Sequence, residues 1–420
     1  MGEPNRLDGG PRSAIVIGAG VVGLSTAWFL QERGVRVTVV DRAGIAAGSS
    51  WGNAGWLAPG LAIPLNEPAV LRYGLRTLLD RQAPLHVPAS PDPRLLKFLA
   101  RFAANCTSTS WSRAVRANLP LSEECLEAFD VLTANGVDAP TIDAPITAMF
   151  ETAGNATGLL EELQRLGEAG QKISYAELTG TELAQQFPQA TSRLGAGVQL
   201  DGQRYVDPGR FVESLARSVI SRGGSIRHRF AVDQIRRHEH AVSVRSAGGR
   251  SLHANAVVLA TGAWLGDLGR KLGIRVPVRA GRGYSFTVPT DDPVPSPIYL
   301  PDIRVACTPY RDGLRMAGTM EFRKPDAALD PARIEAIIAS ARPLLTGIRW
   351  EERTDAWVGS RPVTTDGRPV IGAVDTPGLF VAGGHGMWGL THGPITGRLL
   401  AEQITTGNRP EALRPFDPLR

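Results

Sequence analysis

A glycine pattern near the start of the chain constrains the fold more than any other feature. The GxGxxG segment 18–23 follows the short apolar run 14–17, which predicts a β-strand. It opens the stretch 21–33, which predicts a helix ended by Gly34. The β-branched run 35–40 then predicts a second strand. A strand, a tight glycine turn, a helix and a strand make a βαβ unit, so the sequence predicts an α/β fold with a parallel sheet.

The spacing of these glycines also predicts a ligand. Gly18 permits a sharp turn, Gly20 lets backbone N–H groups approach a pyrophosphate, and Gly23 lets the helix pack closely on the strand. Asp41 can accept hydrogen bonds from a ribose, whereas Arg42 either stacks on adenine or is solvated. A purely structural glycine turn is the alternative. The predicted dinucleotide contacts in this unit are Gly18, Gly20, Val21, Val22, Gly23, Asp41 and Arg42.

Two further strand-to-loop elements lie far along the chain. The apolar run 256–260 leads to Gly262, where the backbone can pass close to a cofactor. The run 379–382 leads to a second GxGxxG at 384–389 and a predicted helix at 394–406. No second strand ending in an acid follows it, so a second nucleotide site is rejected. Its N–H groups suit a flavin ring that gains negative charge on reduction, and three distant loops suit FAD better than NAD.

Composition excludes several other classes of protein. The 420 residues suggest two or three domains, and 43% hydrophobic with 21% charged residues is typical of a globular chain. The net charge of +5 is scattered, so no nucleic-acid-binding stripe is expected. Three distant cysteines favour reduced, packed thiols over zinc or disulfides. Glycines interrupt the apolar stretch 14–30, so we expect a cytoplasmic enzyme with at most peripheral membrane contact.

The remaining patterns predict a discontinuous two-domain chain. Helices are expected at 94–134, 156–168, 208–222 and 331–342, and strands at 146–150, in a meander over 225–253, at 275–288 and across 298–320. The predicted nucleotide-binding domain comprises 13–60, 204–270 and 355–410, and the substrate domain comprises 61–203 and 271–354.

Segments along nearly the whole chain resemble one family. They are IVIGAGVVGLSTAWFL, VTVVDR, NAG with LAPG at 53–60, RYVDPGRFVESLA, VVLATGAW, GRGYSFTV, MAGTMEF, WVGSRPVTTDGRPVIG and LFVAGGHGMWGLTHGPITGRLLAE. In this order they resemble the D-amino-acid oxidase and glycine oxidase superfamily of FAD amine oxidoreductases, and most of all the bacterial D-amino-acid dehydrogenases. The resemblance implies a glutathione-reductase-type FAD domain and a substrate domain with a large antiparallel sheet. It also implies hydride transfer from the substrate Cα–H to flavin N5, giving an imine that hydrolyses to a 2-oxo acid and ammonia.

The resemblance also implies roles for individual residues. Arg361 matches the arginine that clamps the substrate carboxylate, which a guanidinium fork can hold bidentately; a surface ion pair is the alternative. Val232 matches the residue whose backbone meets adenine. No cysteine lies near Arg361, so the FAD is expected to be non-covalent. The further implied cofactor contacts are Gly48, Ser49, Ser50, Asn53, Ala54, Gly55, Trp56, Ala260, Thr261, Gly262, Trp264, Gly384, His385, Gly386, Met387, Gly389, Leu390 and Thr391.

Departures from the family pattern leave the substrate open. Met387 and Trp388 replace the usual residues of the last glycine loop and could reshape the side-chain pocket. Ala306 stands near the place of a tyrosine found in oxidase relatives, with Tyr284, Tyr299 and Tyr310 as imperfect substitutes. The alternative function is therefore oxidation of secondary or cyclic amino acids such as sarcosine or D-proline. Flavin-linked RNA modification is a third possibility, motivated only by the basic charge.

Three catalytic residues are predicted, and two weaker candidates stand beside them. Arg361 is the first; Tyr284 either lines the pocket or packs the sheet, and His385 either approaches the flavin or caps a turn. His392 and Glu321 are the weaker candidates. The electron acceptor, whether a quinone, a carrier protein or oxygen, is left open.

Overall fold

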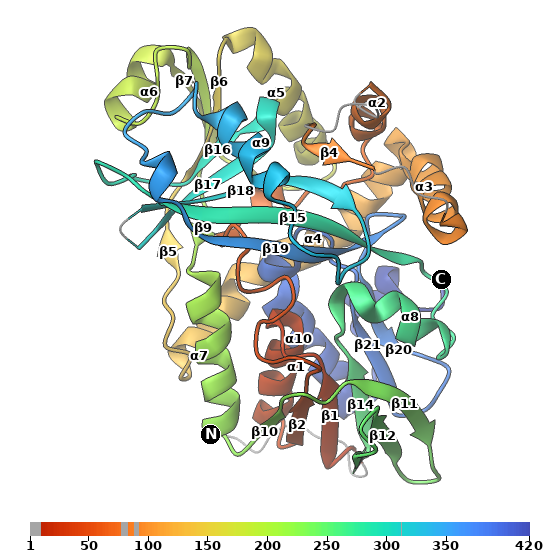
Figure 1. The fold of residues 1–420 in the computed structure, drawn as a ribbon. Coiled ribbons are helices and arrows are strands. Elements are labelled where there is room, and N and C mark those ends of the chain that lie inside the picture. The colour runs from red at the N-terminus through yellow and green to blue at the C-terminus, as the bar shows by residue number, and fades with distance from the viewer. Residues whose placement is uncertain (1–9, 77–82, 88–91, 312) are drawn as a thin grey trace.

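Two β-sheets organise the protein, as the ribbon in Figure 1 shows. The computed structural model describes residues 10–76, 83–87, 92–311 and 313–420. One half is built on a six-stranded sheet and the other on a nine-stranded sheet. Parts of the expected substrate domain, 77–82 and 88–91, lie outside the described residues. The predicted two-domain α/β class is confirmed.

The six-stranded sheet gathers strands from all three segments of the predicted nucleotide-binding domain. Its first five strands run parallel, and only the edge strand β20 runs antiparallel to its neighbour. In sheet order they are β10 (Ser225–Arg227), β2 (Arg36–Val40), β1 (Ser13–Ile17), β14 (Ala256–Leu259), β21 (Leu379–Gly383) and β20 (Val370–Ala373). The register pairs Ile15 with both Thr38 and Val257, so β1 is a central strand buried on both faces.

Alternate residues of β1 belong to two different cores, as the two-residue period of a strand requires. Val16 packs with helices α1 (Val21–Glu32) and α10 (Gly389–Thr406) on one face. Ile17 packs on the other face with the three-stranded meander β11 (Val232–Arg237), β12 (Val242–Ser246) and β13 (Ser251–Ala254). Most of the predicted 225–253 meander therefore forms, while its first strand, β10, joins the central sheet instead.

Two helices complete the α1 face of this sheet. Helix α7 (Pro208–Ser221) begins as predicted, with the side chain of Asp207 accepting a hydrogen bond from the Arg210 N–H. Helix α4 (Ser108–Ala134), expected with the substrate domain, instead adds Leu121 and Phe129 to the core shared with α1. The sequence pattern could not predict this packing, because α4 is far from α1 and α10 in the sequence and shares a core with them only in the folded chain.

The nine-stranded sheet forms the upper half in Figure 1 and is mainly antiparallel. Two pairings are parallel, β16 with β6 and β18 with β4. The strands are, in sheet order, β19 (Thr354–Thr364), β15 (Val278–Pro289), β18 (Gly313–Phe322), β17 (Val305–Tyr310), β16 (Ile298–Leu300), β6 (Ile146–Phe150), β8 (Ala196–Leu200) and β7 (Tyr175–Thr179), with β4 (Leu85–His86) beside β18. Helix α9 (Pro331–Ala341) packs on the sheet through one apolar cluster.

Strand β19 differs from the predicted domain division. Residues 355–364 were expected with the nucleotide-binding domain, yet β19 pairs with β15 in the large sheet, with Gly281 opposite Arg361. The chain leaves the large sheet only after Thr364 and joins the six-stranded sheet as β20. The sequence pattern of β19 alone could not predict this, because only the pairing partner shows which sheet an edge strand belongs to.

Several helix boundaries also differ from the patterns. The expected helix 94–134 is divided into α3 (Pro93–Asn105) and α4, because the Thr107 side chain caps the second helix by accepting from the Ser110 N–H. Thr152 likewise starts α5 (Ala153–Glu168) three residues early. Helix α10 begins at Gly389, with Pro394 inside it. The remaining elements are β3 (Trp56–Leu57), β9 (Arg204–Tyr205) and β5 (Ile142–Asp143) in a small sheet, with α2 (Pro68–Arg76), α6 (Gly180–Gln186) and α8 (Leu265–Arg270).

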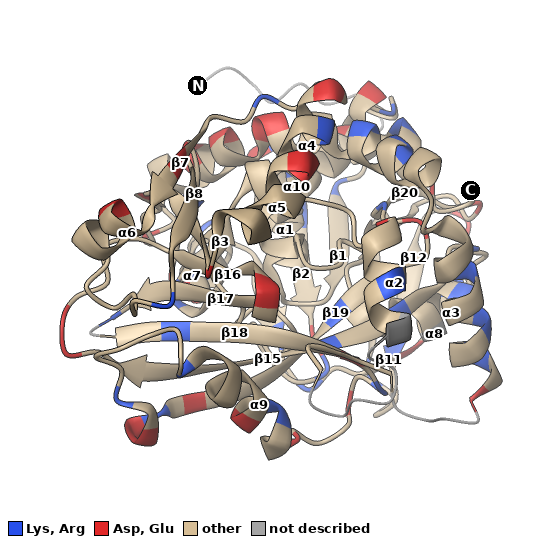
Figure 2. Cartoon of the chain, turned by 90° about the horizontal axis from the view of Figure 1, so that it is seen from above, with Lys and Arg blue, Asp and Glu red and all other residues tan. Residues whose placement is uncertain are grey.

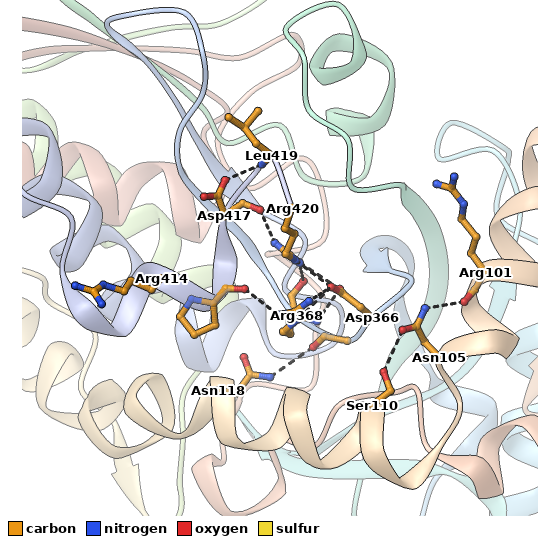
Figure 3. A network of polar contacts seen from close by, with 12 residues as sticks. Arg101, Asn105, Ser110, Asn118, Asp366, Arg368, Arg414, Asp417, Leu419 and Arg420 are labelled. Carbon is orange, nitrogen blue, oxygen red and sulfur yellow. Dashed lines mark hydrogen bonds and ion pairs between the residues drawn. The ribbon is translucent and has the colours of Figure 1, made fainter.

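A half-buried ion cluster lies at the joint between the two sheets. Asp366, in the turn after β19, accepts hydrogen bonds from Arg368 at 2.8 Å and from Arg420 at 3.0 Å (Figure 3). Arg368 also donates to the Pro415 carbonyl. The two guanidinium groups hold the pKa of Asp366 below its usual value although burial opposes this. The cluster ties the crossing to the C-terminal segment.

Charged residues of both signs are mixed over the outer helices in Figure 2. The three cysteines are free and buried, as predicted. Within the described part of the chain, no helix is both long and apolar enough to cross a membrane.

Candidate active site

A cavity of about 920 Å³ lies where the two sheets meet, at the upper end of the range for small-molecule sites. Most of the predicted site residues line it, although they come from loops far apart in sequence. Those lining it are Gly18, Gly20, Val21, Val22, Asp41, Arg42, Gly48, Ser49, Ser50, Asn53, Ala54, Trp56, Val232, Ala260, Thr261, Gly262, Trp264, Tyr284, Arg361, His385, Gly386, Met387, Gly389 and Leu390. Four predicted contacts lie behind the wall: Gly23, Gly55, Gly384 and Thr391.

The first glycine loop is built by close backbone contacts. A Cβ on Gly18, whose φ is +119°, would lie 2.3 Å from the carbonyl oxygen of Ala260. A Cβ on Gly23 would lie 2.0 Å from the carbonyl oxygen of Gly18. Only Ser50 Oγ, at 3.1 Å, would meet a Cβ on Gly20, so this glycine keeps the loop open toward the cavity. The positive end of the α1 dipole is thereby presented to the cavity.

Asp41 and Arg42 are both engaged within the protein. One Asp41 oxygen accepts from the Ala19 N–H at 3.0 Å, and the other accepts from two N–H groups just after it in the chain. A carboxylate has about four acceptor positions, so capacity for a ribose is left. Arg42 pairs with Asp326 and stacks on the Trp264 ring at 3.9 Å. The predicted alternatives for Arg42 were adenine stacking and solvation; the observed stacking partner is a tryptophan.

The loop 48–56 is fixed by its own polar side chains. Ser49 Oγ donates to the Ser360 carbonyl at 3.0 Å, which joins this loop to β19. Ser50 Oγ accepts from the Val21 N–H at 3.1 Å. Asn53 donates to the Ser50 carbonyl and accepts from the Gly55 N–H, so its amide closes the loop. These contacts fix the loop so that its residues line the cavity.

Two later loops complete the cofactor side of the cavity. A Cβ on either Gly262 or Gly386 would meet no atom within 4 Å, and both glycines have positive φ. Thr261 Oγ1 is buried without a hydrogen-bond partner and lies on the cavity wall. Helix α10 has no side-chain cap, so its N-terminal dipole also faces this region. Thr391 lies behind the wall, where its hydroxyl donates to the Trp56 carbonyl at 3.1 Å.

His385 and His392 are buried, neutral imidazoles. Burial, followed by the nearby His392, lowers the pKa of His385 to about 3, and burial lowers the pKa of His392 to about 4. His385 Nε2 lies 2.9 Å from Thr396 Oγ1, and His392 Nε2 lies 3.2 Å from Ser122 Oγ. A group this hard to protonate is a poor general base at neutral pH, so the geometry favours positioning of the glycine loop by His385.

Arg361 lies on the cavity wall directly over Gly283. A Cβ on Gly283 would lie 2.1 Å from an Nη atom of Arg361, so only glycine leaves room for this guanidinium. Its Nη1 donates to the Thr319 carbonyl at 2.9 Å, and Thr319 has a φ of 58°. Burial lowers the pKa of Arg361 to about 10. Among the described residues no carboxylate lies within ion-pair distance of Arg361, so its remaining donors can take an anion from the cavity.

Tyr284 borders the cavity, but its hydroxyl is used elsewhere. It donates to Glu321 Oε1 at 2.5 Å, and its ring belongs to the apolar cluster under α9. Arg282 pairs with the same carboxylate at 3.2 Å, and Arg323 pairs with its other oxygen at 3.3 Å. Burial, then the bond to Glu321, raises the pKa of Tyr284 to about 12. This geometry favours the packing role for Tyr284 and a structural role for Glu321.

Several cavity residues escaped the sequence reasoning. The Trp357 ring covers Gly359 and Gly52, whose added Cβ atoms would lie 1.9 and 2.3 Å from it. Trp388, which the sequence predicted with Met387 to shape the side-chain pocket, does line the cavity and donates to the Ile63 carbonyl. The glycines beside Trp357 were a signal for this stacking. Glu162, on α5, also faces the cavity, and no motif marked it.

Comparison with known proteins identifies the family. The FAD dependent oxidoreductase profile, DAO, matches residues 13–403. The chain belongs to the DAO family of FAD-dependent oxidoreductases. It is 30% identical over 415 residues to D-amino acid dehydrogenase of Vibrio vulnificus, covering 97% of this chain and 99% of that protein.

Two solved structures share the fold of this DAO-family chain. Glycine oxidase from Geobacillus kaustophilus superposes with a TM-score of 0.74 at 22% identity, covering 98% of each chain. L-alpha-glycerophosphate oxidase from Mycoplasma pneumoniae, solved with FAD bound, gives a TM-score of 0.72 at 17% identity and covers 94% of each chain.

The cavity of this DAO-family protein fits its cofactor, FAD. The glycine cradle at Gly18 and Gly20, the unpartnered Thr261 hydroxyl and the two open glycines, Gly262 and Gly386, all face one continuous space. Backbone N–H donors and helix dipoles suit a pyrophosphate and an electron-rich ring. The predicted cofactor is confirmed, and the individual contacts stay predictions.

Proposed function

We propose that this protein oxidises D-amino acids to 2-oxo acids. The single observation that carries the proposal is the unpaired guanidinium of Arg361 on the wall of the FAD cavity. A guanidinium fork binds a carboxylate through two parallel hydrogen bonds and fixes its orientation. Holding that carboxylate sets the position of the attached Cα, which is the atom that must face the cofactor.

The reaction is balanced by the cofactor and water. The loops around Gly20 and Gly386 would hold FAD, which would supply the acceptor for the Cα hydride. The substrate ammonium would first pass a proton to water. The resulting imine takes up water and gives a 2-oxo acid and ammonia. The chain itself binds and orients, since His385 is held neutral and its Nε2 is bonded to Thr396. The substrate is therefore proposed to react as the neutral amine.

Support for the D configuration comes from the Vibrio relative, which is named for D-amino acids and is 30% identical over almost the whole chain. The competing proposal is oxidation of secondary or cyclic amino acids. Its support is that Met387 and Trp388 both line the cavity, so a flat aromatic wall and a flexible thioether border the substrate.

Anaerobic flavin bleaching tests these proposals. Purified holoenzyme is mixed with D- and L-enantiomers of alanine, methionine and arginine, and with sarcosine and D-proline, and absorbance near the flavin maximum is followed. Bleaching by D-enantiomers alone supports the main proposal. Bleaching only by sarcosine or D-proline would replace it with the competing one, and bleaching by no amino acid would refute both.

Two further arms address the electron acceptor and the cofactor linkage. Readmission of air restores the yellow colour rapidly if oxygen is the acceptor, whereas slow recovery that a soluble quinone accelerates indicates another carrier. Acid precipitation should release all of the flavin into the supernatant, because we propose that FAD is held non-covalently. Flavin that stays with the pellet would contradict this.

A further inference from the structure

An unpaired carboxylate faces the cavity from the substrate side. Glu162 lies on helix α5, half-buried, and lines the same cavity as Arg361. Among the described residues, Glu162 makes no ion pair or hydrogen bond. Neither the glycine loops nor the proposed reaction uses this side chain. An anionic group left without a partner on a substrate cavity is available to a cation that enters it.

The acidic groups around Glu162 already have partners. Glu67, from the segment before α2, accepts from Arg165 at 2.8 Å. Asp302 accepts from Asn155 at 3.0 Å. These contacts use the charged ends of both acids, so Glu162 differs from its acidic neighbours.

Tyr299 of β16 and Arg304, in the turn between β16 and β17, are neighbours of Glu162. The Arg304 guanidinium stacks over the Tyr73 ring at 4.8 Å. The Tyr299 ring meets the Trp56 ring edge-on at 5.7 Å, and both border the cavity. Burial raises the pKa of Tyr299, and the charge of Glu162 adds to that rise, so the two groups are electrostatic neighbours.

The sheet sets the separation between Gly283, which lies beneath Arg361, and Tyr299, which neighbours Glu162. Gly283, beneath the Arg361 guanidinium, is on β15, and Tyr299 is on β16, with β18 and β17 between them. Three strand spacings amount to about 14 Å. Ala317 and Ala306 occupy paired positions on the two intervening strands and line the cavity. Small side chains there leave a path between the guanidinium and the carboxylate.

That span suits one chemical class of substrate. An amino acid whose carboxylate lies on Arg361 and whose side chain extends along the path brings its far end toward Tyr299 and Glu162. An extended amino acid with three or four side-chain methylenes and a terminal cation measures about 8 Å from carboxylate to cation, and charge-assisted hydrogen bonds of about 2.8 Å at each end bring the total to about 14 Å. A short side chain, such as that of alanine, cannot reach.

We propose that Glu162 determines specificity and selects D-amino acids with a long cationic side chain, those ending in a guanidinium or an ammonium group. The inference rests on the proposed function, because it assumes that Arg361 holds the substrate carboxylate. It adds a second anchor at the opposite end of the substrate. Burial, followed by the charge of Glu67, raises the pKa of Glu162 to about 7, so a bound cation would also relieve an unfavourable environment.

The experiment compares D-arginine with D-citrulline, which has nearly the same shape without the charge. For the wild-type holoenzyme, kcat/KM should be at least about 10-fold higher for D-arginine, as expected for a charge-assisted pair. Glu162→Gln should remove this preference by lowering the D-arginine value, with D-citrulline unchanged. Glu161→Gln is the matched control, because Glu161 is exposed on the same helix and does not line the cavity.

Charge reversal provides a second variant. Glu162→Lys should reject D-arginine by a further factor of about 10 and improve D-glutamate, because a cation would then face the side chain. Flavin content per protein, together with an unchanged thermal unfolding midpoint, verifies that each variant has folded.

The pH profile separates a direct contact from a structural role. Since the pKa of Glu162 is raised to about 7, the carboxylate ionises as pH rises through this value, and KM for D-arginine should fall there. D-citrulline should show no such step, and Glu162→Gln should abolish it. The charged and titratable groups near Glu162 are Glu67, Arg165, Asp302, Arg304 and Tyr299, and all five are common to wild type and variant.

The outcomes separate the two proposals. If D-citrulline and D-alanine reduce the flavin as efficiently as D-arginine, or if Glu162→Gln leaves the ratio intact, the specificity inference is wrong and the proposed function stands. If no D-amino acid reduces the flavin, both are wrong.

Discussion

The two ends of the cavity are built by different means. At the nucleotide end, Gly18 to Gly23 form one contiguous loop. A Cβ on Gly18 or on Gly23 would lie 2.0 to 2.3 Å from a backbone carbonyl oxygen, so the shape of the loop requires glycine at both positions. At the substrate end, Arg361 on β19 lies over Gly283 of β15 and donates to Thr319 of β18. One end is specified by neighbouring residues and the other by residues from three strands.

The charges at the two ends differ in the same way. Asp41 and Arg42 are satisfied by backbone N–H groups and by Asp326. Arg361 and Glu162 make no direct ion pair among the described residues, although Arg165 and Arg304 lie near Glu162. The nucleotide end, whose charged groups are paired within the protein, can hold the same cofactor through its shape. The substrate end leaves its charged groups available to the substrate. Substrate preference can therefore change through a few side chains while the cofactor site stays intact.

Breaking the nucleotide end should have the largest effect. Gly18→Ala places a Cβ 2.3 Å from the Ala260 carbonyl oxygen at a φ of +119°, where no flexible side chain can yield. We expect protein without bound flavin, measured as the ratio of flavin to protein absorbance after purification. Gly167→Ala is the control, because its Cβ meets nothing within 4 Å and it lies in helix α5. Normal flavin content in Gly18→Ala would show that the cradle is not needed.

Breaking the substrate end should leave the cofactor in place. Arg361→Ala removes the only group proposed to hold the carboxylate, and losing such a partner costs about 2–5 kcal/mol, roughly 30-fold or more in kcat/KM. Most of the loss should fall on KM, with flavin content normal, in steady-state assays with D-amino acids. Arg353→Ala, at an exposed ion pair on the approach to β19, should have little effect. If Arg361→Ala also lost its flavin, the two ends would not be separable.

The smallest effect concerns the histidines behind the cofactor loop. The pKa of His392 is lowered to about 4 in the folded protein, so below its ordinary value of 6.5 the unfolded chain binds a proton that the folded protein does not. Its contribution to stability is full above pH 6.5 and is lost as pH falls toward 4, at about 1.4 kcal/mol per pH unit. Between pH 7 and pH 5, the free energy of unfolding measured in urea should fall less for His392→Gln than for wild type. An equal loss would indicate that the imidazole is accessible.

The sequence predicted the nucleotide end well because its signals are local. The glycine spacing, the strand before it and Asp41 lie within one βαβ unit, and α7 begins at the predicted cap, Asp207. One local signal was not used: the Thr107 side chain caps the start of a new helix, so the helix boundaries differ from the single helix predicted over 94–134. The Asp366 cluster at the joint between the sheets had no local signal either.

By itself, then, the amino-acid order determined the cofactor and the class of fold, because short-range geometry and residue chemistry specify them, and it predicted Arg361 as an anion-binding group. Only the tertiary structure decided that β19 belongs to the large sheet, that the Tyr284 hydroxyl donates to Glu321, and that Glu162 and Arg361 line the same cavity. Those facts depend on which strands pair and which faces meet. Such pairings are set by burial summed over the whole chain, and no single segment carries them.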